Sequence, residues 1–243
     1  MLLLAVLALS FNACSNDDND DEDFGNGKRI TKIVNEYGNN QSLTFVFLYS
    51  NNKLSRYTAF HENNSVEEDK IITYGNNTVA MTGQFDGYGN SVNTVQTFTL
   101  DNNGLAISSK IVSSDGGECN YTYQYSEGYL TKITRKYSDE SQTEMCTLIY
   151  SSGNMTSLQT TYDDNYKFTY SNDKNKGIIS PFLMDSDYIF EHIAAYYIGI
   201  LGKFTNNLIV SSWEETCVYT LDNEEYVKTA TLSNGDKFTY TFE

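Results

Sequence analysis

The sequence predicts an all-β fold, a long antiparallel meander of about 14–16 strands that is curled or closed into a soluble, barrel-like sheet. Three observations predict it. A turn motif returns about every 25 residues, residues of alternating polarity lead into each turn, and the composition has 20 Tyr and 13 Phe but one proline. Aromatic residues favour pleated strands, and proline is excluded from strand interiors.

The first 13 residues have the features of a bacterial signal peptide. Leu2 to Leu9 form an unbroken apolar run that is too short to span a bilayer. The following Ala13-Cys14 resembles a lipobox, in which the cysteine receives a diacylglycerol and becomes the first residue after cleavage. An ordinary cleaved signal needs a small residue where Phe11 stands. We therefore expect residues 1–13 to be removed and a lipid anchor at Cys14, which attaches the protein to a membrane.

Residues 14–27 form an acidic segment behind that cysteine. It contains six acids and no base, and like charges keep such a segment extended and solvated. Its 13 residues from Ser15 to Gly27 span at most about 40 Å. The run also resembles the export signal of Bacteroidetes surface lipoproteins. The expected location is the outer membrane, with the domain facing outside.

The charge of the remaining chain limits its partners. Without the six acids of the tether, 26 acids stand against 16 Lys and Arg, a net charge of about −10. Such a surface repels nucleic acid and anionic headgroups, so neither is an expected partner. Residues 28–243 contain no Pro-, Gly- or Ser-rich linker and are expected to form one domain.

A repeat of about 25 residues organises this domain. Each copy is a strand, a tight turn rich in Ser, Asn, Asp and Gly, and a second strand. The clearest copies begin at Tyr49, Tyr74, Leu100, Tyr125 and Tyr150, and weaker ones at Tyr170 and Leu221.

Alternation assigns the two faces of the strands. One face is aromatic and apolar, as in Tyr121, Tyr123 and Tyr125, and is expected to line the inside. The other face is polar, which disfavours a membrane-spanning barrel. It contains Thr122, Gln124, Thr147, Lys167, Thr169, Thr220, Lys237, Thr239 and Thr241. After each turn, apolar pairs three residues apart indicate a β-bulge. These pairs are Leu54/Tyr57, Leu130/Ile133, Met155/Leu158 and Val227/Ala230.

The repeat is interrupted at residues 178–206. Residues 186–201 are apolar on almost all sides, Asp185 or Ser186 is a suitable N-cap, and Gly202 is a suitable stop. We expect one helix of about four turns there, buried on the concave face of the sheet.

The lipobox, the acidic leader, the Tyr-Ser-Xaa-Xaa-Gly-Xaa-Leu hairpins and the segment Tyr196-Tyr-Ile-Gly-Ile-Leu-Gly-Lys-Phe-Thr-Asn-Asn-Leu208 together resemble a Bacteroidetes lipoprotein domain of unknown function with a porin-like fold. The likeness covers most of residues 28–243. The hairpins alone also resemble YD-repeat shells. The family implies a fold and brings no catalytic residue.

No arrangement of residues indicates catalysis. His192 lies in the apolar helix and is expected to be a packed core residue, whereas His61 lies in a polar loop. The acidic pairs Asp163-Asp164 and Glu214-Glu215 lie in predicted turns, where acids are ordinary and neighbouring side chains point to opposite faces. The turns at 101–104 and 173–177 lack the glutamate that completes a calcium loop. We therefore expect no cofactor and no metal.

Three cysteines remain after Cys14, at Cys119, Cys146 and Cys217. They fall on the aromatic face of strands that a simple meander separates by about 9.5 Å, too far for a disulfide. Free buried thiols are favoured, with a bridge to Cys217 across a closed barrel as the alternative.

Trp213 is the one tryptophan and lies beside Glu214 and Glu215. A surface tryptophan among acids suits stacking on a sugar ring, whereas a lone tryptophan beside a turn more often packs on its own hairpin. Two functions follow as hypotheses. The first is a non-catalytic surface lipoprotein that binds a ligand, possible ligands being a glycan or a surface protein, and the second is a structural or envelope-assembly protein with a filled core.

Overall fold

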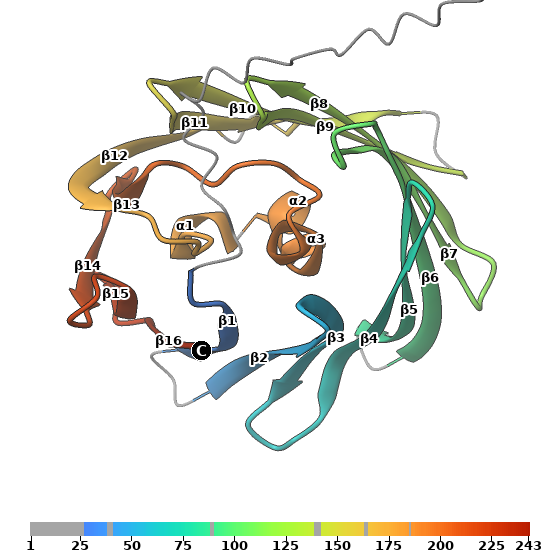
Figure 1. The fold of residues 1–243 in the computed structure, drawn as a ribbon, viewed down its shortest axis with the longest axis horizontal. Helices are drawn as coiled ribbons and strands as arrows, with labels where there is room; N and C mark the ends of the chain where they lie inside the picture. Colours follow the sequence, from blue (N-terminus) through green and yellow to red (C-terminus); the bar gives the residue numbers. More distant parts are fainter. Residues whose placement is uncertain (1–26, 38–40, 88–89, 139–141, 163–164, 185) are drawn as a thin grey trace, which may run out of the picture.

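A computed structural model describes residues 27–37, 41–87, 90–138, 142–162, 165–184 and 186–243. The expected signal peptide, Cys14 and nearly all of the acidic tether lie outside these residues, as do Asp163, Asp164 and Asp185. The described chain forms a closed barrel of 16 antiparallel strands with short helices inside it (Figure 1). The predicted all-β class, the strand number and the closure are confirmed.

Each strand pairs with its neighbours in the chain, and β1 pairs with β16 to close the barrel. The strands are β1 (Ile30–Tyr37), β2 (Gln41–Ser50), β3 (Lys53–His61), β4 (Val66–Gly75), β5 (Thr78–Gly87), β6 (Asn90–Leu100), β7 (Ala106–Ser113), β8 (Glu118–Ser126), β9 (Tyr129–Tyr137), β10 (Glu144–Ser151), β11 (Asn154–Thr160), β12 (Asn165–Lys174), β13 (Asn207–Ser212), β14 (Glu215–Leu221), β15 (Val227–Leu232) and β16 (Lys237–Phe242).

The hairpin turns explain the repeat motif. Both central residues have positive φ in the turns Asn51-Asn52, Glu127-Gly128 and Ser152-Gly153. A two-residue hairpin loop of this geometry matches the right-handed twist of the strands. Asn and Gly tolerate it best, which is why they recur at these positions.

The predicted bulges are present after four turns. The register shifts between Leu48 and Tyr49, Gln124 and Tyr125, Ile149 and Tyr150, and Thr220 and Leu221. In three of these bulges the extra residue is a hydroxyl residue that donates to a carbonyl oxygen across the hairpin, at 2.9–3.1 Å. The donors are Ser55, Thr131 and Thr156.

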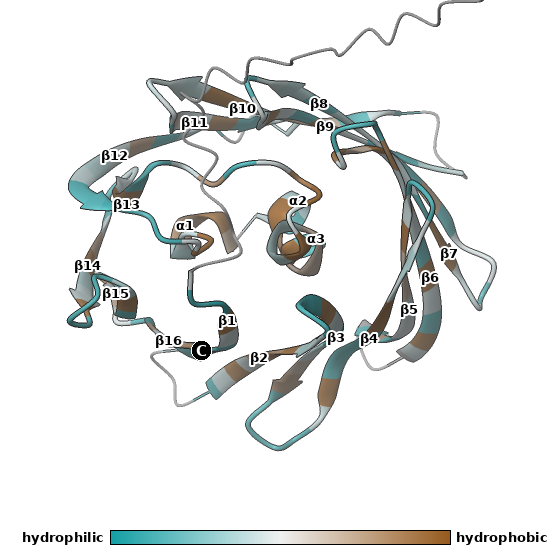
Figure 2. Cartoon of the chain, viewed as in Figure 1, coloured by the Kyte–Doolittle hydropathy of each residue, from teal (hydrophilic) through white to brown (hydrophobic). Residues whose placement is uncertain are grey.

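The two faces are as predicted. Large residues of the aromatic face, such as Phe45, Phe98, Tyr121 and Phe238, are buried, while the predicted polar face is half-buried or exposed. Figure 2 shows apolar residues concentrated on the helices and interspersed along the strands. No helix among the described residues has the length and apolar character needed to cross a membrane.

The interruption forms three short helices rather than one long one: α1 (Pro181–Met184), α2 (Asp187–Phe190) and α3 (Ile193–Ile198). The prediction of one four-turn helix over 186–201 is therefore wrong in its continuity. The backbone leaves helical geometry at His192, and Gly199, with φ of 89°, ends α3 before the expected stop at Gly202. The predicted burial is confirmed, because the helices lie inside the barrel (Figure 1).

Candidate functional site

The barrel has two different ends. We call the end that carries the turns 51–52, 127–128 and 152–153 the proximal end, because the chain enters the barrel there before β1. The turn between β13 and β14 lies at the opposite, distal end, as the antiparallel strand order requires.

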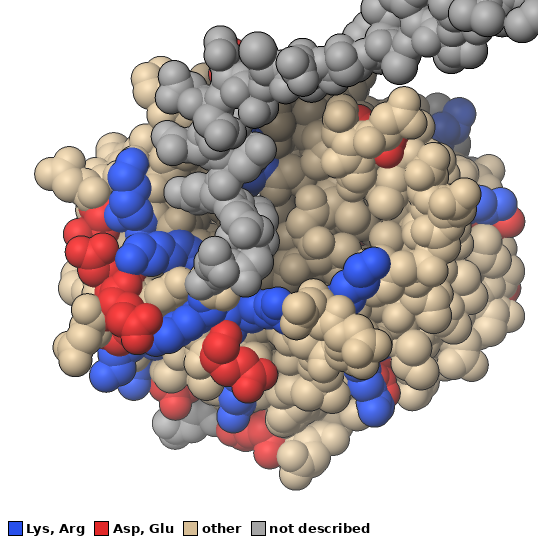
Figure 3. All heavy atoms as spheres, in the orientation of Figure 1, with Lys and Arg blue, Asp and Glu red and all other residues tan. Residues whose placement is uncertain are grey.

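The entry of the chain is held by several contacts. The backbone N–H of Lys28 donates to the Tyr226 hydroxyl at 3.0 Å. The ammonium group of Lys28 donates to Glu224 Oε1 at 2.7 Å. Arg29 and Glu243 exchange backbone hydrogen bonds of 2.7 and 2.9 Å. Figure 3 shows basic and acidic side chains interleaved around this region, where the C-terminus also lies. Lys28 and Arg29 are therefore held at a fixed point at the proximal end.

Trp213 lies in the distal turn, and its side chain is exposed (63%). Its ring stacks on Tyr166 of β12 with centroids 4.7 Å apart and an interplanar angle of 8°. The indole N–H donates to the Asn165 carbonyl at 2.7 Å. Trp213 thus packs on a neighbouring strand, and the stack and the hydrogen bond fix the plane of an exposed ring.

The backbone of Trp213 is also unusual. Its φ is 51°, in the left-handed region where a bulky residue costs about 1–2 kcal/mol. Other hairpins of this barrel place Asn, Gly, Ser or Glu in that conformation, and Trp213 is the bulkiest residue that the described chain holds there. Backbone strain at an exposed aromatic residue is typical of functional positions, where it is kept for a purpose other than stability.

Aromatic rings of the helices inside the barrel pack against its wall, as Phe190 does on Phe45. We use the name plug for residues 178–201, which include α1, α2 and α3. A void of about 20 Å³ remains beside the plug, against Tyr150, Met155 and Phe204. This holds about one water molecule and is too small for a substrate.

His192 joins the plug to the wall through a hydrogen-bonded chain. Its Nδ1–H donates to the Tyr188 carbonyl at 2.8 Å, so its Nε2 accepts from the Tyr123 hydroxyl at 2.7 Å. That hydroxyl also lies 2.8 Å from Ser109 Oγ. Burial lowers the pKa of His192 to about 4, consistent with a neutral ring. The expectation of a packed core histidine is met.

A second connection joins the plug to β9 and β10 through charges. Arg135 donates from Nε to Glu144 at 2.6 Å and from Nη1 to Glu191 at 2.9 Å. The Tyr121 hydroxyl donates to the other oxygen of Glu191 at 2.7 Å, and Tyr162 donates to Glu144. All four carboxylate oxygens are occupied. This cluster therefore holds the plug to the barrel wall, and its carboxylates have no free oxygen for a ligand.

Residues 200–206 cross the proximal ends of successive hairpins, and we call them the strap. Backbone hydrogen bonds join Ala106 N to Ile200 O, Lys203 N to Gly128 O and Asn206 N to Gly153 O, at 2.8–2.9 Å. Three extended residues span about 10 Å, which equals two strand spacings. The spacing of three in the strap therefore matches the spacing of the hairpins.

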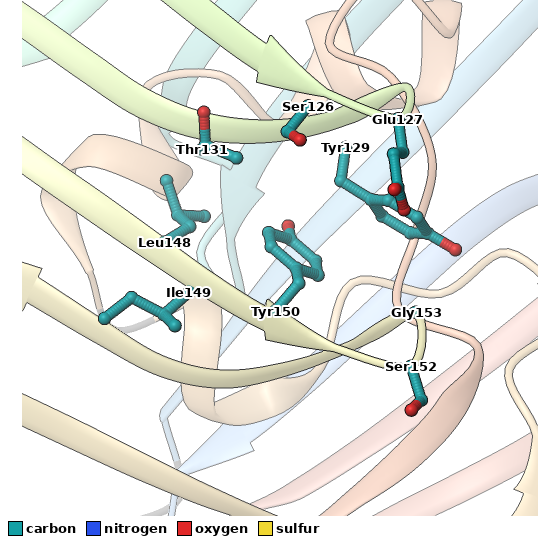
Figure 4. A pocket seen from close by; sticks show the side chains of 9 residues that line it. All are labelled: Ser126, Glu127, Tyr129, Thr131, Leu148, Ile149, Tyr150, Ser152 and Gly153. Atoms are coloured by element: carbon teal, nitrogen blue, oxygen red, sulfur yellow. The ribbon is translucent and has the colours of Figure 1, made fainter.

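A slot opens in the barrel wall beneath the strap. Strands β9 and β10 stay paired only as far as Lys132 and Thr147. Beyond these residues the two hairpins diverge and leave a cavity of about 370 Å³ (Figure 4). It is lined by Ser126, Glu127, Tyr129, Thr131, Leu148, Ile149, Tyr150, Ser152 and Gly153.

The other residues considered above do not converge on a site. His61 lies 3.0 Å from Glu67 at the surface, away from His192. The Asp101 carboxylate accepts two backbone N–H groups of its own turn, at 2.9 Å each. Within the described residues, no group of three His, Cys, Asp or Glu is placed to hold a metal ion.

The cysteines of the barrel are Cys119, Cys146 and Cys217, and all are free and buried. Free buried thiols were the favoured interpretation of the sequence, and the alternative bridge to Cys217 is absent from the described barrel. Burial raises the pKa of Cys146 to about 12 and that of Cys217 to about 11, which leaves both as unreactive thiols.

Several connections were not foreseen from the sequence. The cluster around Arg135, the strap contacts and the slot all join residues far apart in the chain. One sequence signal was available, because the strap falls within the distinctive Tyr196–Leu208 segment. The structure adds that the hydrogen-bonded positions of the strap recur every three residues.

A closed antiparallel barrel with a helical plug defines the class of this protein. Residues 47–243 match the family described as a domain of unknown function (DUF4595) with porin-like fold, and the chain belongs to this family. The predicted resemblance is confirmed.

Solved structures agree on the fold. A porin-like protein from Bacteroides uniformis is 24% identical, with a TM-score of 0.70 over 88% of this chain and 96% of that one. A second, from Bacteroides vulgatus, is 12% identical, with a TM-score of 0.57 over 89% and 99%. None of the functionally curated proteins matches the chain.

Proposed function

We propose that this protein is an exported, lipid-anchored lipoprotein of the cell surface that binds a neutral carbohydrate without transforming it. Trp213 is the residue that contacts the sugar. The family and its Bacteroides neighbours are compatible with a place in the cell envelope. The signal sequence and Cys14 supply the anchor.

The observation that carries the proposal is the state of Trp213. An exposed indole is held in one plane by Tyr166 and Asn165 and in a costly backbone conformation. A fixed aromatic plane loses little conformational entropy when a sugar ring stacks on it. Glu214 and Glu215 follow Trp213 in the sequence, and carboxylates suit hydrogen bonds to sugar hydroxyls.

The arrangement of the barrel supports the proposed display. The chain enters at the proximal end, whereas Trp213 lies at the distal end. A tether that extends from the proximal end leaves the distal end free to face outward. The ring would then meet extracellular glycans without any movement of the plug.

Glycan arrays test the ligand. We expect saturable binding to neutral oligosaccharides, lost in Trp213→Ala. The control is Val218→Ala, which removes an apolar side chain exposed to 69% on β14 and should bind as the wild type does. Clean blanks from the array and from pull-downs with surface extracts would reject the proposal.

Palmitate labelling tests the anchor separately. The wild type should label and fractionate with membranes, and Cys14→Ala should do neither. Replacement of the acids in Asp17 to Asp23 by neutral residues should reduce surface display while labelling persists. A Cys14→Ala variant that still labels and sediments with membranes would rule out the lipoprotein.

The plug inside the barrel favours a second function, that of a structural or envelope-assembly protein. The void of about 20 Å³ beside the plug is too small for a ligand. If neither glycan nor surface protein binds, while deletion of the gene alters the envelope, this alternative is the one supported.

A further inference from the structure

We infer that the slot between β9 and β10 is a second binding site, which takes a small neutral saccharide. The inference takes its ligand class partly from the proposed function. The slot lies toward the proximal end and is lined by other residues than the Trp213 site, so the inference and the proposed function can fail separately.

The slot is built into the fold. Thr131 is the extra residue of a bulge in β9, and Thr156 is the extra residue of the bulge between β10 and β11. Bulges bend their strands and end regular pairing. The strap then fixes the two hairpin turns through Gly128 and Gly153. The hairpins are therefore held apart before any ligand arrives.

The slot has the size of a small-ligand site. Its volume of about 370 Å³ lies at the lower end of the usual range of about 300–1,000 Å³. In Figure 4 the Tyr150 ring lies between the two hairpins, with its hydroxyl directed toward the β8–β9 hairpin. The side chains of Leu148 and Ile149 lie on one side of this ring and Glu127 and Tyr129 on the other.

The polar groups of the slot are available to a ligand. Among the described residues, no hydrogen bond engages the side chains of Ser126, Glu127, Tyr150 or Ser152. By contrast, the Tyr129 hydroxyl donates to Asn206 at 2.9 Å. The slot thus offers three free hydroxyls and one free carboxylate beside aromatic and aliphatic surface.

This chemistry selects the class of ligand. The lining contains no Lys or Arg, and Glu127 repels an anion. Hydroxyls both donate and accept, and a carboxylate accepts two hydrogen bonds from neighbouring hydroxyls of one sugar. An apolar sugar face can pack on Tyr150 and Ile149. A neutral mono- or disaccharide satisfies all of these groups.

Saturation-transfer NMR and calorimetry test the slot on the full chain. The probes are glucose, galactose, mannose and their disaccharides, with glucuronate and glucose 6-phosphate as charged comparisons. We expect at least one neutral sugar to saturate, and the charged sugars to bind at least tenfold more weakly. Saturation by the charged sugars at equal affinity, or by no sugar, would overturn the inference.

Variants locate the binding. Tyr150→Phe should weaken it about tenfold, the value of one hydrogen bond of about 1.4 kcal/mol. Ser126→Trp, at an exposed position, should fill the slot and abolish the binding that remains in the Trp213→Ala background. Tyr49→Phe is the matched control, because Tyr49 occupies the equivalent position in the β2–β3 hairpin, outside the slot.

Trp213→Ala separates the two sites. It should leave slot binding unchanged while it removes binding to the array. If Tyr150→Phe and Ser126→Trp both fold and bind the sugar as the wild type does, the slot is not the site. If Trp213→Ala removes all sugar binding, the slot inference fails and the proposed function stands.

Discussion

Arg135 of β9 reaches into the lumen and donates from Nη1 to Oε1 of Glu191 on the plug, at 2.9 Å. The side chain of Arg135 is 9% exposed and also contacts Glu144 at 2.6 Å. Its guanidinium lies 4.7 Å from the centre of the Tyr188 ring. One wall residue therefore holds both the middle of the plug, at α2, and the neighbouring strand β10.

Arg135→Met should lower the free energy of unfolding by about 3 kcal/mol, because it leaves two carboxylates without their partner in a buried setting. Urea denaturation measures the loss. Lys110→Met is the control, since it breaks the exposed pair with Glu118 and should cost less than about 1 kcal/mol. Equal losses in the two variants would show that the plug is not held by Arg135.

Two glycines test how closely the strap packs: Gly202 within it and Gly199 just before it. Gly199 and Gly202 have φ of 89° and 86°, so alanine at either position costs about 1 kcal/mol. A Cβ on Gly199 meets no atom within 4 Å, whereas one on Gly202 would collide with the carbonyl oxygen of Gly128. Thermal unfolding should show the larger drop in Tm for Gly202→Ala. A drop of the same size in Gly199→Ala would argue against close packing of the strap.

The buried His192 should make stability depend on pH. Its pKa is about 4 in the folded protein and 6.5 as the ordinary value, so the unfolded chain binds the proton first. The contribution of His192 to the free energy of unfolding is on the order of 3 kcal/mol. It is fully present above pH 6.5 and is lost as the pH falls from 6.5 to 4. His192→Gln should remove this contribution in urea denaturation across that range, whereas the opposite slope from Glu68, whose pKa burial raises to about 7, should persist in both proteins. His61→Asn, at an exposed position, should behave as the wild type, and the same pH dependence in His192→Gln and the wild type would contradict the assignment.

Trp213→Asn should separate binding from stability. Asparagine accepts the left-handed backbone, which recovers about 1 kcal/mol, and the lost stack on Tyr166 costs a similar amount. The free energy of unfolding should therefore change by less than about 1 kcal/mol, while binding of the oligosaccharide identified on the array is lost. Calorimetry and urea denaturation on one preparation measure both. A large loss of stability would mean that Trp213 serves the fold.

The features of the barrel that could be predicted from the sequence depend on residues close together in the chain. Turn residues such as Asn51 and Asn52 report their own backbone conformation, and alternation along a strand reports which face is buried. The bulges were predictable from apolar pairs three residues apart, whereas the hydroxyl residues that fill three of them, Ser55, Thr131 and Thr156, were not predicted. Apolar pattern also predicted that the plug is buried.

What escaped prediction depends on contacts between distant residues. The helix breaks at His192 because its ring bonds to Tyr188 and to Tyr123 on β8, which its own neighbours in sequence do not reveal. The Arg135–Glu191 pair spans 56 positions, and no local pattern marks either residue. Trp213 was named from its chemistry alone, and its strained backbone became visible only in three dimensions.

Fluorescence of Trp213 tests the central claim most directly, because the chain has one tryptophan and its emission reports one place. Titration with a neutral oligosaccharide identified on the array should change the emission saturably, with the same Kd as calorimetry. Tyr166→Ala should weaken that response, and Val218→Ala should preserve it. An array oligosaccharide whose calorimetric binding is lost in Trp213→Ala but which leaves the emission of Trp213 in the wild type unchanged would contradict the account.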